Sequence, residues 1–370
     1  MAKVCRTLFL GTDDFALVCL KKLLERSKFS DSPIGGIEVV NLPRKKKERA
    51  SAVQKYAQEN NLIQHAWPPL ASHIVDRFDT AAVVSFGALL PDYFLDLFPK
   101  PCVNVHPSLL PRWRGAAPLA HTIMAGDPVS GVTLLQVSKR KFDIGPILMQ
   151  ESCAVEQDTD VTELSQQLAT LGSDMLVKCL ENYDEYLENA RPQQQSGSTW
   201  AKKITKDIAE VDWANMTVKS IIRLQQALCD RYAVKTSFDS IPVRLHGIGD
   251  LLDVVTDVDD FIPSSVESGT PGVAFHRSDS NFVCIRCQDG WVTVEEFHFL
   301  GEKEHVLAED FALEQMQDLK EHISDSLGNT TTSNSNTTSN TSNTTSNSNS
   351  DNADEDDEDV YYYIGRFSPS

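Results

Sequence analysis

An amide and an imidazole stand two residues apart near the middle of the chain. Asn104 and His106 belong to a short, mostly apolar segment, 102–106, that predicts a buried strand. Side chains two apart on a strand share a face, and burying polar groups there costs free energy unless they have partners. At the carboxyl end of a strand, the pair could stabilise an oxyanion and move a proton. A hydrogen-bonded core histidine beside a turn asparagine explains the spacing equally well.

The residues after this strand predict a stiff loop that allows close approach of another group. Pro107 and Pro111 cannot donate to a strand ladder and fix their own backbone angle φ. The segment 112–117, Arg-Trp-Arg-Gly-Ala-Ala, then supplies two charges, an aromatic ring and three small residues.

The sequence from Asn104 to Pro118 resembles the signature of the 10-formyltetrahydrofolate-dependent formyltransferases. Two further motifs of that family are matched, Gly-Thr-x-x-Phe-Ala at 11–16 and Asp-x-Gly at 143–145. The three occur in order and at the expected separations, and the resemblance covers roughly residues 5–300. It is strongest to the branch that formylates initiator methionyl-tRNA for translation initiation, and it leans toward the animal mitochondrial members.

The resemblance implies a catalytic trio of Asn104, His106 and Asp143, without a metal. Asn104 would donate to the oxyanion, His106 would polarise or protonate it, and Asp143 would orient His106 and take up the amine proton. The formyl donor would be 10-formyltetrahydrofolate, with backbone groups of 86–91 meeting the pterin. A hydrophobic staple before the next helix explains 86–91 nearly as well. The expected folate-binding residues are Phe86, Gly87, Leu89, Leu90, Ser108, Leu109, Leu110 and Pro111.

Initiator methionyl-tRNA is the expected partner by resemblance, although the chain is acidic overall. The formal net charge of −19 argues against indiscriminate nucleic-acid binding but not against a local basic patch. A basic run at 44–49 follows an expected strand at 37–42, where open α/β folds bind ligands. Such a run is otherwise a solvated charged surface. The expected tRNA-binding residues are Arg44, Lys45, Lys46, Lys47, Arg49, Arg112, Arg114, Lys202, Lys203 and Lys206.

The sequence predicts an α/β domain followed by a small barrel. A βα unit opens the chain, and 80–86 is nearly continuously apolar, as buried parallel strands are. Short strands separated by Gly and Asp turns after residue 240 favour a small β-barrel, which the resemblance makes OB-like. We expect four parts: 1–187, a Rossmann-like, mostly parallel formyltransferase domain; 188–209, a linker; 210–322, the OB-like tRNA-binding barrel; and 323–370, a low-complexity disordered tail.

Several other site classes are disfavoured. The eight cysteines show no paired framework, which is typical of a reduced, intracellular protein, and the single Cys284-x-x-Cys287 lacks a second pair at zinc spacing. No apolar run approaches the roughly 18 residues of a membrane span.

The resemblance favours a monomer in the mitochondrial matrix. No presequence is visible before the first strand, so a cytoplasmic location is the alternative.

Other functions also fit parts of the sequence. One is a formyltransferase of the same core that acts on a sugar-nucleotide amine or another small amine. Another is a hydrolase that delivers the formyl group to water. A third is a non-catalytic RNA-binding relative, which a basic loop and an OB-like barrel would also suit. Intact Asn104, His106 and Asp143 argue against the last of these.

Overall fold

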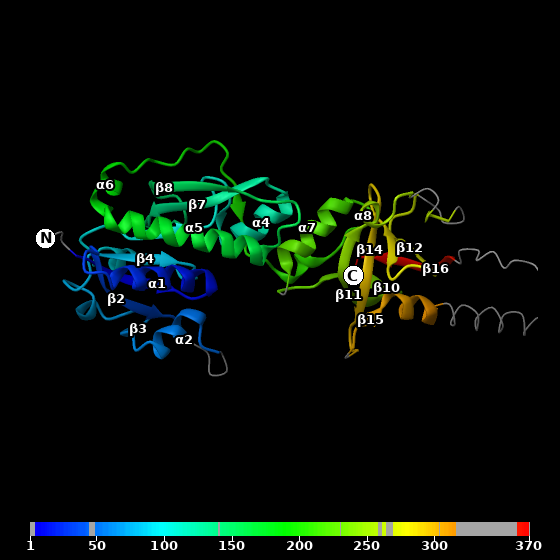
Figure 1. Ribbon diagram of the computed structural model, residues 1–370, viewed down its shortest axis with the longest axis horizontal. Coiled ribbons are helices and arrows are strands. Elements are labelled where there is room, and N and C mark those ends of the chain that lie inside the picture. The colour runs from blue at the N-terminus through cyan, green and yellow to red at the C-terminus, as the bar shows by residue number, and fades with distance from the viewer. Residues whose placement is uncertain are drawn as a thin grey trace, which may run out of the picture. The chain divides into compact units, whose positions relative to one another are not determined.

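The chain folds into two compact units, shown in the computed structural model of Figure 1. One unit comprises Met1–Thr205 with Gln226–Cys229, and the other comprises Lys206–Gln225 with Asp230–Ser370. The structure describes residues 4–43, 49–139, 141–229, 231–257, 261–263, 269–302, 304–315 and 361–369, with the backbone alone at 361–363.

The first unit is built on a seven-stranded sheet in the order β3-β2-β1-β4-β5-β7-β8 (Figure 1). The five strands from β3 to β5 are parallel, whereas β7 and β8 run antiparallel to their neighbours. The expected mostly parallel α/β domain is therefore confirmed. The strands are β1 Cys5–Gly11, β2 Ile34–Asn41, β3 Gln64–Ala66, β4 Thr80–Val84, β5 Val103–His106, β7 Val129–Gln136 and β8 Ile147–Ala154.

Helices α1 and α5 pack side by side on this sheet (Figure 1). The Asp13 carboxylate caps α1 by accepting from the Ala16 N–H, and Asp160 with Glu163 forms a capping box at the start of α5. β4 is buried at all five positions, as its apolar run predicts. The helices are α1 Asp14–Ser27, α2 Ala52–Glu59, η1 Ala71–His73, α3 Asp92–Leu95, α4 Pro118–Ala125, α5 Val161–Glu181 and α6 Tyr183–Glu188.

The second unit is a small closed antiparallel barrel. Its strands follow the order β11-β10-β16-β12-β13-β14, and β14 pairs back with β11 to close the ring, while β15 adds to β14 outside it. The expected barrel is confirmed. Its elements are η2 Lys206–Ala209, α7 Val218–Leu228, β10 Val234–Phe238, β11 Ile241–Asp250, α8 Leu251–Val254, β12 Val273–Arg277, β13 Val283–Arg286, β14 Trp291–Phe299, β15 Val306–Leu307 and β16 Tyr361–Ser368. The end of α7, from Gln226, is counted with the first unit.

Strand β16 corrects the expectation of a disordered tail over 323–370. Tyr361–Ser368 pairs with both β10 and β12 and so completes the barrel. Ile364 and Phe367 are buried, and the Phe367 ring packs on Phe238 with centroids 4.9 Å apart. Residues 323–360 and 370 of the expected tail lie outside the described residues.

The expected linker at 188–209 also differs from the structure. β9 (Trp200–Ala201) pairs in parallel with β6 (Arg114–Gly115), so this segment packs back onto the first unit. The first unit accordingly extends to Thr205 rather than to 187.

Within the described residues, no helix has the length and apolar character needed to cross a bilayer.

Candidate active site

The carboxyl ends of three neighbouring parallel strands define one edge of the sheet. Gly11 at the end of β1 is level with Val84 of β4, which in turn is level with Val105 of β5. The loops that leave this edge are 12–13, 85–91 and 107–113. Open α/β sheets bind ligands outside this edge.

The structure brings the three predicted catalytic side chains together here. The Asn104 amide Nδ2 donates to Asp143 Oδ1 at 3.1 Å, and His106 Nδ1 lies 3.6 Å from the same oxygen. The side chains of His106 and Asp143 are 5% and 9% exposed. An amide donor, an imidazole and a carboxylate thus meet in a largely dry setting, where hydrogen bonds and charges act strongly.

Asp143 is held in an unusual backbone conformation. Its φ of 53° lies in the left-handed region, which few non-glycine residues adopt. Gln193 stabilises this turn, because its Nε2 donates to the carbonyls of Asp143 and Gly145, each at 2.9 Å. A Cβ at Gly145 would lie 1.7 Å from the Gln136 carbonyl oxygen, so the Asp-x-Gly turn requires glycine there.

The second carboxylate oxygen of Asp143 binds the loop after β5. The Gly115 N–H donates to Asp143 Oδ2 at 3.0 Å. Gly115 has a φ of 117°, and a Cβ there would lie 2.6 Å from the Ala201 carbonyl oxygen of β9. The small residues of the 112–117 segment therefore serve a close approach of backbone to backbone.

The hydrogen bonds of His106 fix its orientation. Its Nε2 lies 2.9 Å from the Trp113 carbonyl oxygen, and because a carbonyl can only accept, Nε2 carries the hydrogen. Nδ1 is therefore the nitrogen that faces Asp143. Trp113 is held in turn by its N–H, which donates to Thr199 Oγ1 at 2.8 Å, and by its indole Nε1, which donates to Asp127 at 2.7 Å.

The expected folate-binding residues fall into buried and exposed groups. Phe86 and Leu90 belong to the hydrophobic core, and the Phe86 ring packs on Trp67 at 5.1 Å, which favours the staple interpretation for these two side chains. Gly87 and Leu89 are exposed at the strand edge. Their loop starts from Ser85, whose carbonyl accepts from Thr12 Oγ1 at 2.6 Å.

The 108–111 loop is tied down by strand β7. Thr133 Oγ1 donates to the Ser108 carbonyl at 2.6 Å and accepts from the Leu110 N–H at 3.1 Å. Ser108 and Leu110 are buried, whereas Leu109 and Pro111 are partly exposed. These bonds give the loop a fixed shape beside the catalytic cluster.

Burial changes the chemistry of one further carboxyl group at this edge. It raises the pKa of Asp13, an effect opposed by hydrogen bonds from the Ala16 N–H and from Ser85. This residue follows β1 directly and caps α1, so the βα turn has a structural role.

The expected tRNA-binding residues differ in exposure. Arg49, Lys202, Lys203 and Lys206 are exposed, while Arg44–Lys47 lie outside the described residues. Arg112 pairs with Asp127 at 2.6 and 2.7 Å, and its guanidinium lies 4.3 Å from the Trp113 ring centroid.

Arg114 does not fit the predicted tRNA contact, because it is only 3% exposed. Its guanidinium donates to Gln193 Oε1 at 2.7 and 3.1 Å and to Ser198 Oγ at 2.9 Å. Arg114 therefore holds the 193–198 segment, from which Gln193 binds the 143–145 turn. The sequence analysis missed Gln193 and Thr199, since their polar surroundings are equally typical of a linker.

Comparisons with known proteins identify the family. The family model described as formyl transferase matches residues 27–180. Mitochondrial methionyl-tRNA formyltransferase of Mus musculus is 37% identical over 290 residues, which cover 78% of this chain and 73% of that one. The Homo sapiens protein of the same name is 34% identical over 307 residues, 83% of this chain and 76% of that one.

A solved structure shares the fold at low identity. It is WlaRD, a sugar 3N-formyl transferase crystallised with dTDP and 5-N-formyl-THF. It superposes with a TM-score of 0.54 at 16% identity, covering 81% of this chain and 99% of that one. The identity to the two mammalian proteins, over most of each chain, decides the family. This chain belongs to the methionyl-tRNA formyltransferases.

Proposed function

We propose that this chain transfers the formyl group of 10-formyltetrahydrofolate to the α-amine of methionine on initiator methionyl-tRNA. The observation that carries the proposal is the cluster of Asn104, His106 and Asp143 at the carboxyl end of β5. It contains the donor, the base and the imidazole that formyl transfer to an amine requires, in a chain of this family.

A folate-derived donor is supported by the fold, because the WlaRD structure was solved with 5-N-formyl-THF. We assign the donor to the sheet edge between loops 85–91 and 107–111. Gly87 is exposed there with a φ of 77°, and a Cβ at this position would meet nothing within 4 Å. This leaves room for the flat ring of a pterin against the backbone.

In the first chemical step, the methionine amine attacks the formyl carbon and a C–N bond forms. The amine loses a proton as it attacks, and Asp143 is the carboxylate positioned to accept it. Asn104 meets the oxyanion of the tetrahedral intermediate. An amide nitrogen carries two hydrogens, so Asn104 can bind Asp143 with one and the oxyanion with the other. One such donor contributes about 3–4 kcal/mol to the barrier reduction.

In the second step, the bond from the formyl carbon to N10 breaks and tetrahydrofolate leaves. N10 needs a proton, and the proton that Asp143 accepted can return through His106 Nδ1, 3.6 Å away. A protonated His106 beside Asp143 also places positive charge near the oxyanion. The Trp113 carbonyl keeps Nδ1 facing the cluster throughout.

We assign the contacts with tRNA to the exposed basic residues. Arg49, Lys202, Lys203 and Lys206 are exposed, and such side chains position an RNA through its phosphates rather than reading its bases. Arg44–Lys47 continue the basic run next to Arg49 in the sequence.

We also propose a mitochondrial location, because the mouse and human relatives are mitochondrial proteins. Imaging the chain with a C-terminal fluorescent fusion, beside a matrix marker, tests this. A diffuse cytoplasmic signal would support the cytoplasmic alternative instead.

The deciding experiment measures formyl transfer from 10-formyltetrahydrofolate to methionyl initiator tRNA. Wild type, Asn104→Ala and the control Asn60→Ala, an exposed residue at the end of α2, are compared. We expect transfer by the wild type and the control, and its loss in Asn104→Ala with tRNA binding retained. Transfer only to a sugar-nucleotide amine, release of formate without tRNA, or tRNA binding without turnover would each reject the proposal.

A further inference from the structure

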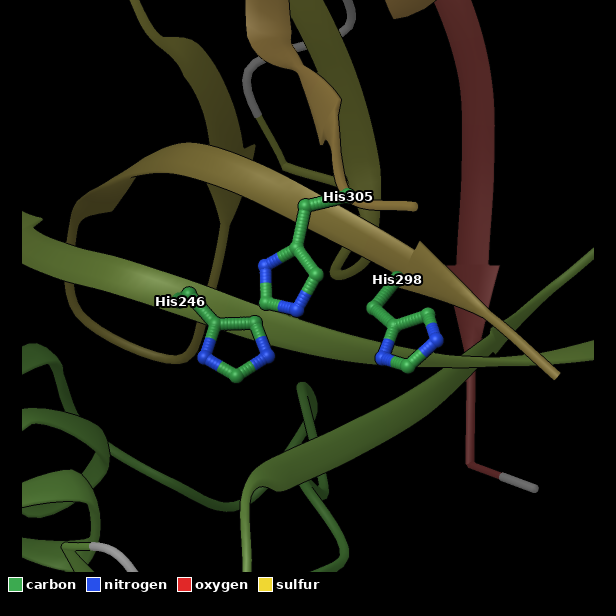
Figure 2. A group of neighbouring side chains, drawn as sticks. All are labelled: His246, His298 and His305. Carbon is green, nitrogen blue, oxygen red and sulfur yellow. The ribbon is translucent and has the colours of Figure 1, made fainter. Parts of the chain in front are cut away.

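Three histidine side chains converge on the outside of the barrel (Figure 2). His246 comes from β11, His298 from β14, and His305 from the turn between β14 and β15. One ring nitrogen of each lies within 4.8 Å of the corresponding nitrogens of the other two. The His246 and His298 rings lie 4.7 and 4.8 Å from that of His305, centroid to centroid.

Strand register explains why the rings meet. β11 and β14 are antiparallel neighbours in which His246 pairs with Glu296 and Arg244 pairs with His298. Residues two apart on a strand share a face, so His246, Glu296 and His298 lie on one face of the ladder. The turn after β14 brings His305 back over them, where its Nδ1 donates to Glu296 Oε2 at 2.9 Å.

The hydrogen bonds leave one nitrogen of each ring directed at the common centre. His305 uses Nδ1 for Glu296, and His298 uses Nε2 to donate to the Glu302 carbonyl at 3.1 Å. In the neutral rings, the lone pairs therefore lie on His305 Nε2 and His298 Nδ1. Figure 2 shows these two nitrogens and Nε2 of His246 pointing toward one another.

His246 Nε2 supplies an independent observation. This atom is buried and has no hydrogen-bond partner among the residues that the structure describes. A buried polar atom without a partner costs free energy, and one nitrogen of each of the other two imidazoles lies within 4.8 Å of a His246 nitrogen.

We propose that His246, His298 and His305 bind a divalent transition-metal ion, with zinc as the best fit. Three imidazole nitrogens with a fourth position open to water are an established ligand set for zinc. Zinc–nitrogen bonds are about 2.0–2.1 Å long, so binding requires the nitrogens to draw together by small side-chain rotations. Glu296 orients His305 through its other nitrogen, as carboxylates do behind metal-binding histidines.

The charge around the site suits a cation. Glu296, Glu302 and Glu304 precede His305 in the sequence and outnumber the basic Lys303 that stands among them. Arg244 is a basic residue whose charge acts on His246. This site lies in the barrel unit, whereas Asn104, His106 and Asp143 belong to the first unit. Its role is to fasten the turn before β15 to β11 and β14.

The test is a zinc titration of the untagged, full-length chain by calorimetry, under reducing conditions. We expect one zinc ion to bind per chain in the micromolar range or tighter, and the unfolding midpoint to rise with zinc concentration. His246→Gln, His298→Gln and His305→Gln should each weaken binding by at least about 100-fold. Glu296→Gln should weaken it by about 10–100-fold, as loss of an orienting carboxylate does.

Two controls separate this site from other binding. His73→Gln removes an exposed histidine of the first unit and should leave zinc affinity unchanged. Cobalt(II) in place of zinc should give a ligand-field spectrum without the intense thiolate absorption that binding to any of the eight cysteines would add. Absence of zinc binding, binding that survives all three histidine substitutions, or a cobalt–thiolate spectrum would each overturn the proposal.

Discussion

Replacing Asp143 by asparagine is the sharpest test of the active-site geometry, because it changes charge and hydrogen-bonding capacity but hardly changes volume. The carboxylate accepts from Asn104 Nδ2 on one oxygen and from the Gly115 N–H on the other. An asparagine has one acceptor oxygen and one amino group. Whichever way its amide turns, the amino group faces one of these two donors.

The structure sets the size of both effects. A buried donor left without an acceptor costs about 1–3 kcal/mol, so the free energy of unfolding should fall by that amount. Loss of the proton acceptor should lower kcat about 100- to 10,000-fold, which corresponds to about 2.7–5.4 kcal/mol of barrier at 1.36 kcal/mol per tenfold. The basic residues are untouched, so the Kd for tRNA should not change.

The assay is single-turnover formylation of methionyl initiator tRNA, combined with urea unfolding and tRNA binding. Asp79→Asn is the matched control. The Asp79 side chain is 5% exposed, against 9% for Asp143, and it accepts from the Arg6 N–H and guanidinium. Asp79 precedes β4, at the opposite edge of the sheet. The Asp79→Asn variant should be less stable than wild type but should keep its turnover. If Asp143→Asn kept kcat within a few-fold of wild type, neither the assigned base nor the reasoning from its contacts would stand.

Three further predictions concern residues around the site and the barrel. Gly145→Ala forces a methyl group toward the Gln136 carbonyl and should abolish turnover with a loss of about 1–3 kcal/mol in stability; an active, fully stable variant would contradict this. Gln193→Ala removes the two hydrogen bonds that Nε2 donates to the 143–145 turn and the Oε1 acceptor that binds the Arg114 guanidinium. The kcat should therefore fall while the KM for tRNA stays constant. A change in KM alone would contradict a positioning role. Phe367→Ala should cost about 3–5 kcal/mol in urea unfolding, as a fully buried ring does, and unchanged stability would place β16 outside the barrel.

Local sequence patterns predicted much of the first unit. The apolar run at 80–86 predicted a strand, which the structure shows as β4. The turn predicted at 11–14 contains Asp13, which caps α1. The barrel was predicted from short strands, but the contribution of β16 to it was not. β16 follows a long Asn/Ser/Thr and acidic stretch, and a single isolated strand carries no periodic signal that separates it from such surroundings.

Motifs predicted which side chains would cluster at the end of β5, but contacts between residues far apart in the sequence were missed. Asn104 and His106 share a strand, and the resemblance added Asp143. Gln193 reaches the 143–145 turn from 50 and 48 residues away, so no local pattern connects them. The histidine cluster follows the same rule, since only the register of β11 and β14 brings His246 to His298.

The position of β16 also has a consequence for biosynthesis. Thr236 Oγ1 of β10 donates to the Ser368 carbonyl across a separation of 132 residues. At about 5–20 residues per second, translating 316–360 alone takes roughly 2–9 s, during which β10 and β12 have been made but have no β16 to pair with. Unpaired strand edges are templates for aggregation. The nascent barrel should therefore depend on chaperones until 361–368 emerges. A nonsense mutation or proteolytic cut anywhere in the Asn/Ser/Thr stretch removes β16 and should lower the amount of soluble protein in the cell, even though the catalytic unit is already complete.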